Sequence, residues 1–154
     1  VCSIQMRSIY RCKGVFCGAG SDALNVPAIR DEIIYLTGKK QCKVLYLGTA
    51  TYDLDGPMEK QTELFSEAGA TIEIINIADT EPLATLESSF QQADVVIVSG
   101  GNTLYAVDRW KELGIDVLLR KGMERGLILA GGSAGAIVWF DSGHSDSADP
   151  SSFK

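Results

Sequence analysis

Short runs of Val, Ile and Leu alternate along this chain with longer segments of helical periodicity. The apolar runs predict strands at residues 14–17, 43–47, 71–75, 94–99 and 127–130. Strands and helices that alternate in this way form parallel β-α-β units. The fourth run is apolar at consecutive positions, which is typical of a central strand covered on both faces. We therefore predict an α/β fold with a three-layer, doubly wound, mostly parallel sheet.

Proline and glycine positions predict where the helices begin and end. Helices are expected at about 27–36, 57–68, 81–92, 103–113 and 116–125, with a short final helix that ends near residue 140. The predicted ends are followed by glycines, which adopt the left-handed conformation that closes many helices: Gly38, Gly69, Gly114 and Gly126. Polar residues dominate 49–56 and 141–154, so both segments are predicted as loops.

Length, composition and charge narrow the class of protein. The 154 residues, 45% hydrophobic and 22% charged, suit a single domain over 1–154. The longest apolar runs have strand length and are too short to cross a bilayer. A net charge of −6 argues against a nucleic-acid binder, which needs a basic face. Residues 1–19 lack the apolar core of a secretory signal, so we expect a cytoplasmic protein with no membrane or nucleic-acid partner.

The four cysteines all lie near the N-terminus. Their spacing matches no metal or redox motif, at Cys2, Cys12, Cys17 and Cys42. Reduced thiols are therefore expected, with no metal site and no cofactor.

The strongest candidate for chemistry is a serine directly after the last predicted strand. Gly131-Gly132-Ser133-Ala134-Gly135 contains the Gly-x-Ser-x-Gly pattern of a nucleophile elbow, a sharp strand-to-helix turn that projects the serine above the sheet. Glycines on either side let the backbone pass close to neighbouring elements. The amide of Ala134 would then face the oxyanion of an acyl-transfer reaction. A plain tight turn or a phosphate cradle is the simpler interpretation of the same glycines.

A second glycine-rich strand end supports the elbow interpretation. Gly100-Gly101-Asn102 follows the fourth predicted strand, and ligands of open α/β sheets bind at the carboxyl ends of the strands. We expect this segment to supply the other oxyanion donor and to contact the substrate through Gly100 and Asn102. Asn102 also suits the N-cap of the following helix.

A serine nucleophile requires a base, usually a histidine oriented by a carboxylate. His144 is the only histidine of the chain, and Asp146 suits the acid because many α/β hydrolases run in the order nucleophile, acid, histidine. If Asp146 is the acid, this order requires a histidine after it, and the sequence has none there. Asp141 and Asp149 are weaker candidates for the acid, and His144 is a weak candidate for the base.

These motifs resemble a known family. Residues 98–103, Val-Ser-Gly-Gly-Asn-Thr, and 131–136, Gly-Gly-Ser-Ala-Gly-Ala, are similar to those of the peptidase E family, the aspartyl dipeptidases related to cyanophycinase. The family fold resembles the class I glutamine amidotransferases, related to the flavodoxin-like fold, with serine in place of cysteine. The resemblance covers about residues 14–140 and about two thirds of a family domain, so we expect a peptidase domain that lacks its C-terminal third.

The resemblance implies roles for individual residues. Ser133 would be the nucleophile, the amides of Gly101 and Ala134 the oxyanion hole, and Asp146 the acid. The histidine of the family lies in a Pro-His context beyond residue 154, and His144 would belong to the loop before the acid.

Three hypotheses follow from these residues. The first is a serine peptidase that hydrolyses small peptides, including those with an N-terminal Asp, through an acyl-enzyme on Ser133. Arg109 is a weak candidate to bind an acidic substrate. The second is a non-catalytic domain that binds a small molecule or anion at the two glycine ends. The third is an inactive fragment of the peptidase. Under each hypothesis the protein could be a monomer or a homodimer.

Overall fold

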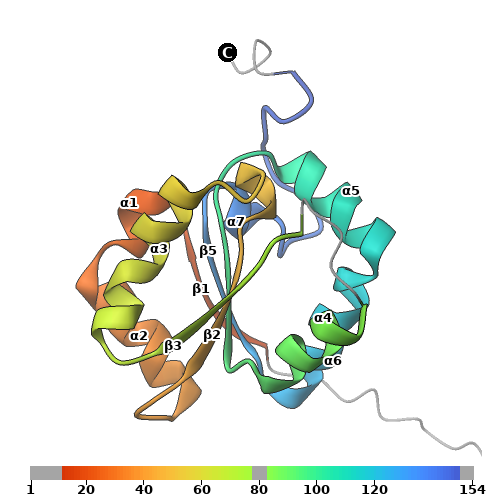
Figure 1. The fold of residues 1–154 in the computed structure, drawn as a ribbon. Coiled ribbons are helices and arrows are strands. Elements are labelled where there is room, and N and C mark those ends of the chain that lie inside the picture. The colour runs from red at the N-terminus through yellow and green to blue at the C-terminus, as the bar shows by residue number, and fades with distance from the viewer. Residues whose placement is uncertain (1–11, 78–82, 150–154) are drawn as a thin grey trace, which may run out of the picture.

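The computed structural model describes residues 12–77 and 83–149, and it contains one parallel sheet (Figure 1). The strand order is β1-β5-β4-β2-β3. Every neighbouring pair is parallel. The strands are β1 Lys13–Cys17, β2 Lys43–Leu47, β3 Thr71–Ile75, β4 Val95–Val98 and β5 Ile128–Gly132. The predicted α/β fold is confirmed, and each predicted strand lies within two residues of an observed one.

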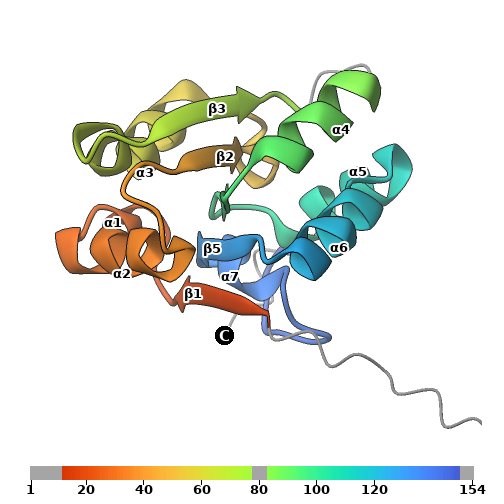
Figure 2. The same cartoon turned by 90° about the horizontal axis from the view of Figure 1, so that it is seen from below.

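Helices cover both faces of the sheet and complete three layers (Figure 2). One layer holds α1 Ser21–Leu24, α2 Pro27–Thr37 and α3 Asp55–Glu67. The other holds α4 Leu83–Gln92, α5 Thr103–Leu113 and α6 Ile115–Arg125, while the short α7 Ala134–Ile137 directly follows β5. In the described part of the chain, no helix has the length and apolar character needed to cross a membrane.

Alternating side chains of the strands build two separate cores. Leu45 and Leu47 of β2 point into the core on the α4–α6 side, where Trp110 is also buried. Val44 and Tyr46 point the other way, into the core shared with Phe65 of α3. Because β4 is buried at every position, it is the central strand that the sequence predicted.

The predicted glycine stops are found where helices end. The backbone φ angle is 68° at Gly38, 71° at Gly114 and 95° at Gly126, and each residue is the C-cap of its helix. Gly69, one residue beyond the cap of α3, has a φ of 84°. The short helix α1 was not predicted, and it buries Leu24 completely.

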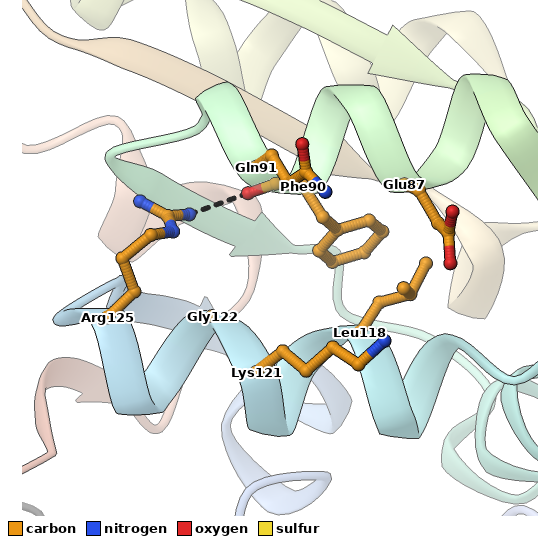
Figure 3. A pocket seen from close by; sticks show the side chains of 7 residues that line it. All are labelled: Glu87, Phe90, Gln91, Leu118, Lys121, Gly122 and Arg125. Carbon is orange, nitrogen blue, oxygen red and sulfur yellow. Dashed lines mark hydrogen bonds between the residues drawn. The ribbon is translucent and has the colours of Figure 1, made fainter.

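A cavity of about 180 Å³ lies between α4 and α6, away from the carboxyl edge of the sheet (Figure 3). Phe90 and Leu118 form its floor, and Arg125 donates a hydrogen bond of 2.6 Å to the carbonyl of Phe90. Both helices end here and lead into the amino ends of β4 and β5. This cavity is therefore a gap between packed helices at the amino edge of the sheet. Ligands of such sheets bind at the opposite, carboxyl edge.

Candidate active site

Ser133 occupies a strained turn between β5 and α7. Its φ of 55° and ψ of −122° lie in a region that residues other than glycine rarely adopt. Its amide donates a hydrogen bond of 2.9 Å to the carbonyl of Cys17, which extends the β1–β5 ladder by one residue. The side chain is exposed at the carboxyl edge of the sheet. This is the strand-to-helix geometry that presents a nucleophile in α/β hydrolases.

The glycines beside Ser133 are required by close packing of the backbone. A Cβ atom at Gly135 would overlap the carbonyl of Val98 and lie 2.7 Å from the oxygen of Ser99. One at Gly131 would overlap the carbonyl of Gly135 itself. The expected close passage at Gly131 and Gly135 is confirmed, because contacts this short exclude any side chain.

Three glycine-containing strand ends meet around the serine. A Cβ atom at Gly100, after β4, would lie 3.4 Å from the Cβ of Ser133. One at Gly20, after β1, would lie 3.9 Å from the same atom. The expected convergence of the β4 and β5 ends is present, and the β1 end with Gly20 joins them, which was not expected. The Gly-Ala-Gly run at 18–20, also after a strand, was the signal that could have found it.

The backbone amides of Gly101 and Ala134 are the predicted oxyanion donors near Ser133. Within the described ranges 12–77 and 83–149, neither Gly101 nor Ala134 donates its amide to another residue. Gly101 has a φ of 119°, and a Cβ atom there would overlap the carbonyl of Ala50. Amides aimed at developing negative charge stabilise an oxyanion. Both amides therefore have hydrogens available to a ligand, and their role as oxyanion donors stays a prediction.

Asn102 forms the predicted N-cap of α5. Its Oδ1 accepts a hydrogen bond of 3.0 Å from the amide of Tyr105, and its Nδ2 donates one of 3.2 Å to the hydroxyl of Tyr52. The rings of Tyr52 and Tyr105 lie 4.7 Å apart. Asn102 thus joins the loop after β2 to the helix after β4.

Removal of this cap gives a stability prediction. We expect Asn102→Ala to lower the free energy of unfolding by about 1 kcal/mol, because the amide of Tyr105 loses its partner. Asn102→Asp keeps the accepting oxygen and should stay closer to wild type. Urea unfolding followed by circular dichroism compares the three proteins, and equal losses in both variants would contradict a capping role.

The candidate acid and base lie in the segment after α7. His144 and Asp146 are both exposed, as are Asp141 and Asp149. Inside the described part of the chain, the hydroxyl of Ser133 makes no hydrogen bond, so neither His144 nor Asp146 is bonded to it. The structure therefore joins the serine to the two glycine ends but does not assemble a hydrogen-bonded triad from these residues.

Arg109 makes contacts that hold the fold. Its Nε donates a hydrogen bond of 3.1 Å to the carbonyl of Ile77, and its Nη1 lies 3.0 Å from a carboxylate oxygen of Glu112. A role in binding substrate stays a prediction.

Cys17 lies at the end of β1 beside the elbow but is not a competing nucleophile. Burial raises the pKa of its thiol, so the thiol is protonated at neutral pH and reacts poorly. Cys12, Cys17 and Cys42 are free, and Cys2 lies outside the described residues. No cluster of three potential metal ligands occurs within 12–77 and 83–149.

A protein-family model matches nearly the whole chain. The model of peptidase family S51 matches residues 16–153. The chain belongs to peptidase family S51. Among curated relatives, it is 33% identical to the uncharacterized peptidase YgaJ of Bacillus subtilis over 118 residues, an alignment that covers 77% of this chain and 51% of that protein. It is 29% identical over 102 residues to peptidase E of Salmonella typhimurium, covering 66% of this chain and 42% of that protein.

Solved structures show the same fold. A putative peptidase E from Listeria monocytogenes superposes with a TM-score of 0.66 at 23% identity, over 82% of this chain and 60% of that one. A peptidase from an acI-B1 actinobacterium gives a TM-score of 0.65 at 18% identity, over 82% and 56%. This S51 chain spans about half the length of the curated relatives that it matches.

Proposed function

We propose that this S51 chain carries the nucleophile half of a serine peptidase that cleaves small peptides through an acyl-enzyme on Ser133. The observation that supports this most is the backbone of Ser133, with φ 55° and ψ −122°. Strained backbone of this kind clusters at functional sites, and a nucleophile elbow uses it to present the serine side chain.

The reaction would proceed in two steps. The Oγ of Ser133 attacks the peptide carbonyl while a base removes its proton, and the amides of Gly101 and Ala134 stabilise the negative oxygen. The C–N bond then breaks, and the base returns the proton to the leaving amine. Water hydrolyses the ester that remains on Ser133 and regenerates the hydroxyl.

Roles for the acid and base are proposed on the family resemblance. Asp146 would orient a histidine, which in peptidase E relatives follows in a Pro-His context. His144 stays the candidate within this chain. An N-terminal Asp substrate is the expectation that the resemblance to peptidase E suggests, and action in the cytoplasm is a further part of the proposal.

Peptide hydrolysis tests this proposal. The protein as its gene encodes it should release amino acids from a dipeptide panel, with a burst of the first product if acylation is faster than deacylation. Ser133→Ala should lower kcat about a thousandfold or more. Hydrolysis that survives this substitution would contradict the proposal. Binding of dipeptides without cleavage would instead favour the anion- or small-molecule-binding domain.

A further inference from the structure

A second cavity, of about 410 Å³, lies next to the candidate site. Side chains of α5, of α7 and of the segment that follows α7 line it, and its volume falls in the range of small-ligand pockets. Six of the lining side chains are apolar: Leu104, Val107, Ile137, Val138, Phe140 and Ala148. Among the described residues that line it, Asp141 is the one with a charge, and four others carry hydroxyl groups: Thr103, Ser142, Ser145 and Ser147. Within this part of the chain the wall is therefore mostly apolar, with one negative group and no Lys or Arg.

Specific contacts hold the walls of this cavity together. The hydroxyl of Ser147 accepts a hydrogen bond of 2.8 Å from the amide of Thr103, the first residue of α5. The hydroxyl of Ser145 lies 2.8 Å from that of Ser147 and donates to the Thr103 hydroxyl at 3.3 Å. At the other wall, a Cβ atom at Gly143 would lie 2.5 Å from Cγ2 of Ile137. The segment is thus anchored to α5 and close-packed against α7.

Both walls of the cavity belong to helices that begin at the candidate site. Ile137, on one wall, donates its amide to the carbonyl of Ser133 at 3.1 Å, so it lies one helical turn above the serine. Thr103, on the other wall, is two residues after Gly101. The cavity is therefore lined by α7 and by the beginning of α5, the two helices that directly follow Ser133 and the Gly100-Gly101-Asn102 segment.

From these features we infer that the cavity receives an apolar side chain of the peptide, from a residue that flanks the scissile bond. This inference rests on the proposed function and gives it a substrate class. An apolar side chain gains from burial against the six apolar residues. An acidic one would meet the carboxylate of Asp141 and lose part of its hydration with no Lys or Arg among the described lining residues to replace it.

No Lys or Arg is among the described residues that line the cavity, and an acidic substrate needs such a cation. Arg109 lines an adjoining cavity, where Asp108 and Glu112 also lie. Its guanidinium is already paired with Glu112 and bonded to the carbonyl of Ile77. An aspartyl substrate would have to compete for it with the existing carboxylate. Leucine-like substrates fit these charges better than aspartyl ones.

The test compares the hydrolysis of leucyl and aspartyl dipeptides, first by the wild-type protein and then by a variant with an added charge in the cavity wall. Dipeptides with Leu or Asp on either side of the bond are assayed with the protein as its gene encodes it. We expect kcat/KM for the better Leu position to exceed that for Asp at least tenfold. Leu104→Arg, which places a cation at the cavity, should shift this ratio about tenfold towards Asp. Leu104 is 49% exposed, so the fold tolerates the change.

Val117→Arg is the matched control. Val117 is also 49% exposed, but it lies on α6 outside the cavity, and this variant should keep the wild-type ratio. A wild-type preference for Asp, or the same ratio in both arginine variants, would overturn the inference and leave the peptidase proposal standing. Failure to hydrolyse any dipeptide would overturn both.

Discussion

Ser133→Gly should abolish hydrolysis and at the same time make the protein more stable. The serine has a φ of 55° and a ψ of −122°, a conformation that costs a residue with a side chain about 1–3 kcal/mol. Glycine adopts it without that cost, although glycine also loses more chain entropy on folding. We expect the free energy of unfolding to rise by about 1 kcal/mol, measured by urea unfolding.

Ser133→Ala is the matched variant for this prediction. Alanine also removes the hydroxyl but keeps a Cβ atom in the same strained backbone, so its stability should stay near that of wild type. Both variants should be inactive on peptides. If glycine is no more stable than alanine, the turn at Ser133 stores no strain, and the elbow interpretation loses its main support.

The second large effect is expected from Gly135→Ala. The new Cβ atom would overlap the carbonyl of Val98 and approach that of Ser99 to 2.7 Å. Neither carbonyl can move without distorting the end of the central strand β4. We expect a loss of about 3 kcal/mol or more in the free energy of unfolding, and loss of peptide hydrolysis in any protein that still folds.

Gly18→Ala and Gly56→Ala separate this packing effect from the general effect of adding a methyl group. A Cβ atom at either position meets no atom within 4 Å. Gly56 lies inside α3, where alanine is favoured by about 1 kcal/mol. Unfolding measurements should therefore rank Gly135→Ala far below both controls. A loss at Gly135 no larger than at Gly18 would contradict the packing account.

The sequence predicted the fold well because local signals and long-range structure agree. Buried runs such as 95–98 can only be central strands, and glycines such as Gly38 and Gly114 end helices in a conformation that other residues rarely adopt. The strand-to-helix turn at Ser133 was predictable for a similar reason. Its serine and glycines are contiguous in sequence, so their spacing indicates the turn, while its role as a nucleophile elbow stays a proposal.

Features that depend on contacts between distant segments were not predictable. Gly20 lies beside Ser133 only because β1 and β5 are neighbours in the sheet, an order that hydrophobic periodicity does not contain. The anchoring of Ser147 to Thr103 joins residues 44 positions apart. The order of residues alone made His144 and Asp146 candidates, but order does not bring side chains to the serine.

The most direct test of a nucleophilic Ser133 is covalent labelling. An alkyl fluorophosphonate is added to the protein as its gene encodes it, and intact mass and peptide mapping locate the adduct. The account predicts one adduct per chain on the peptide containing Ser133, and none in Ser133→Ala. An unlabelled wild-type protein, or an adduct that persists in Ser133→Ala, would contradict it.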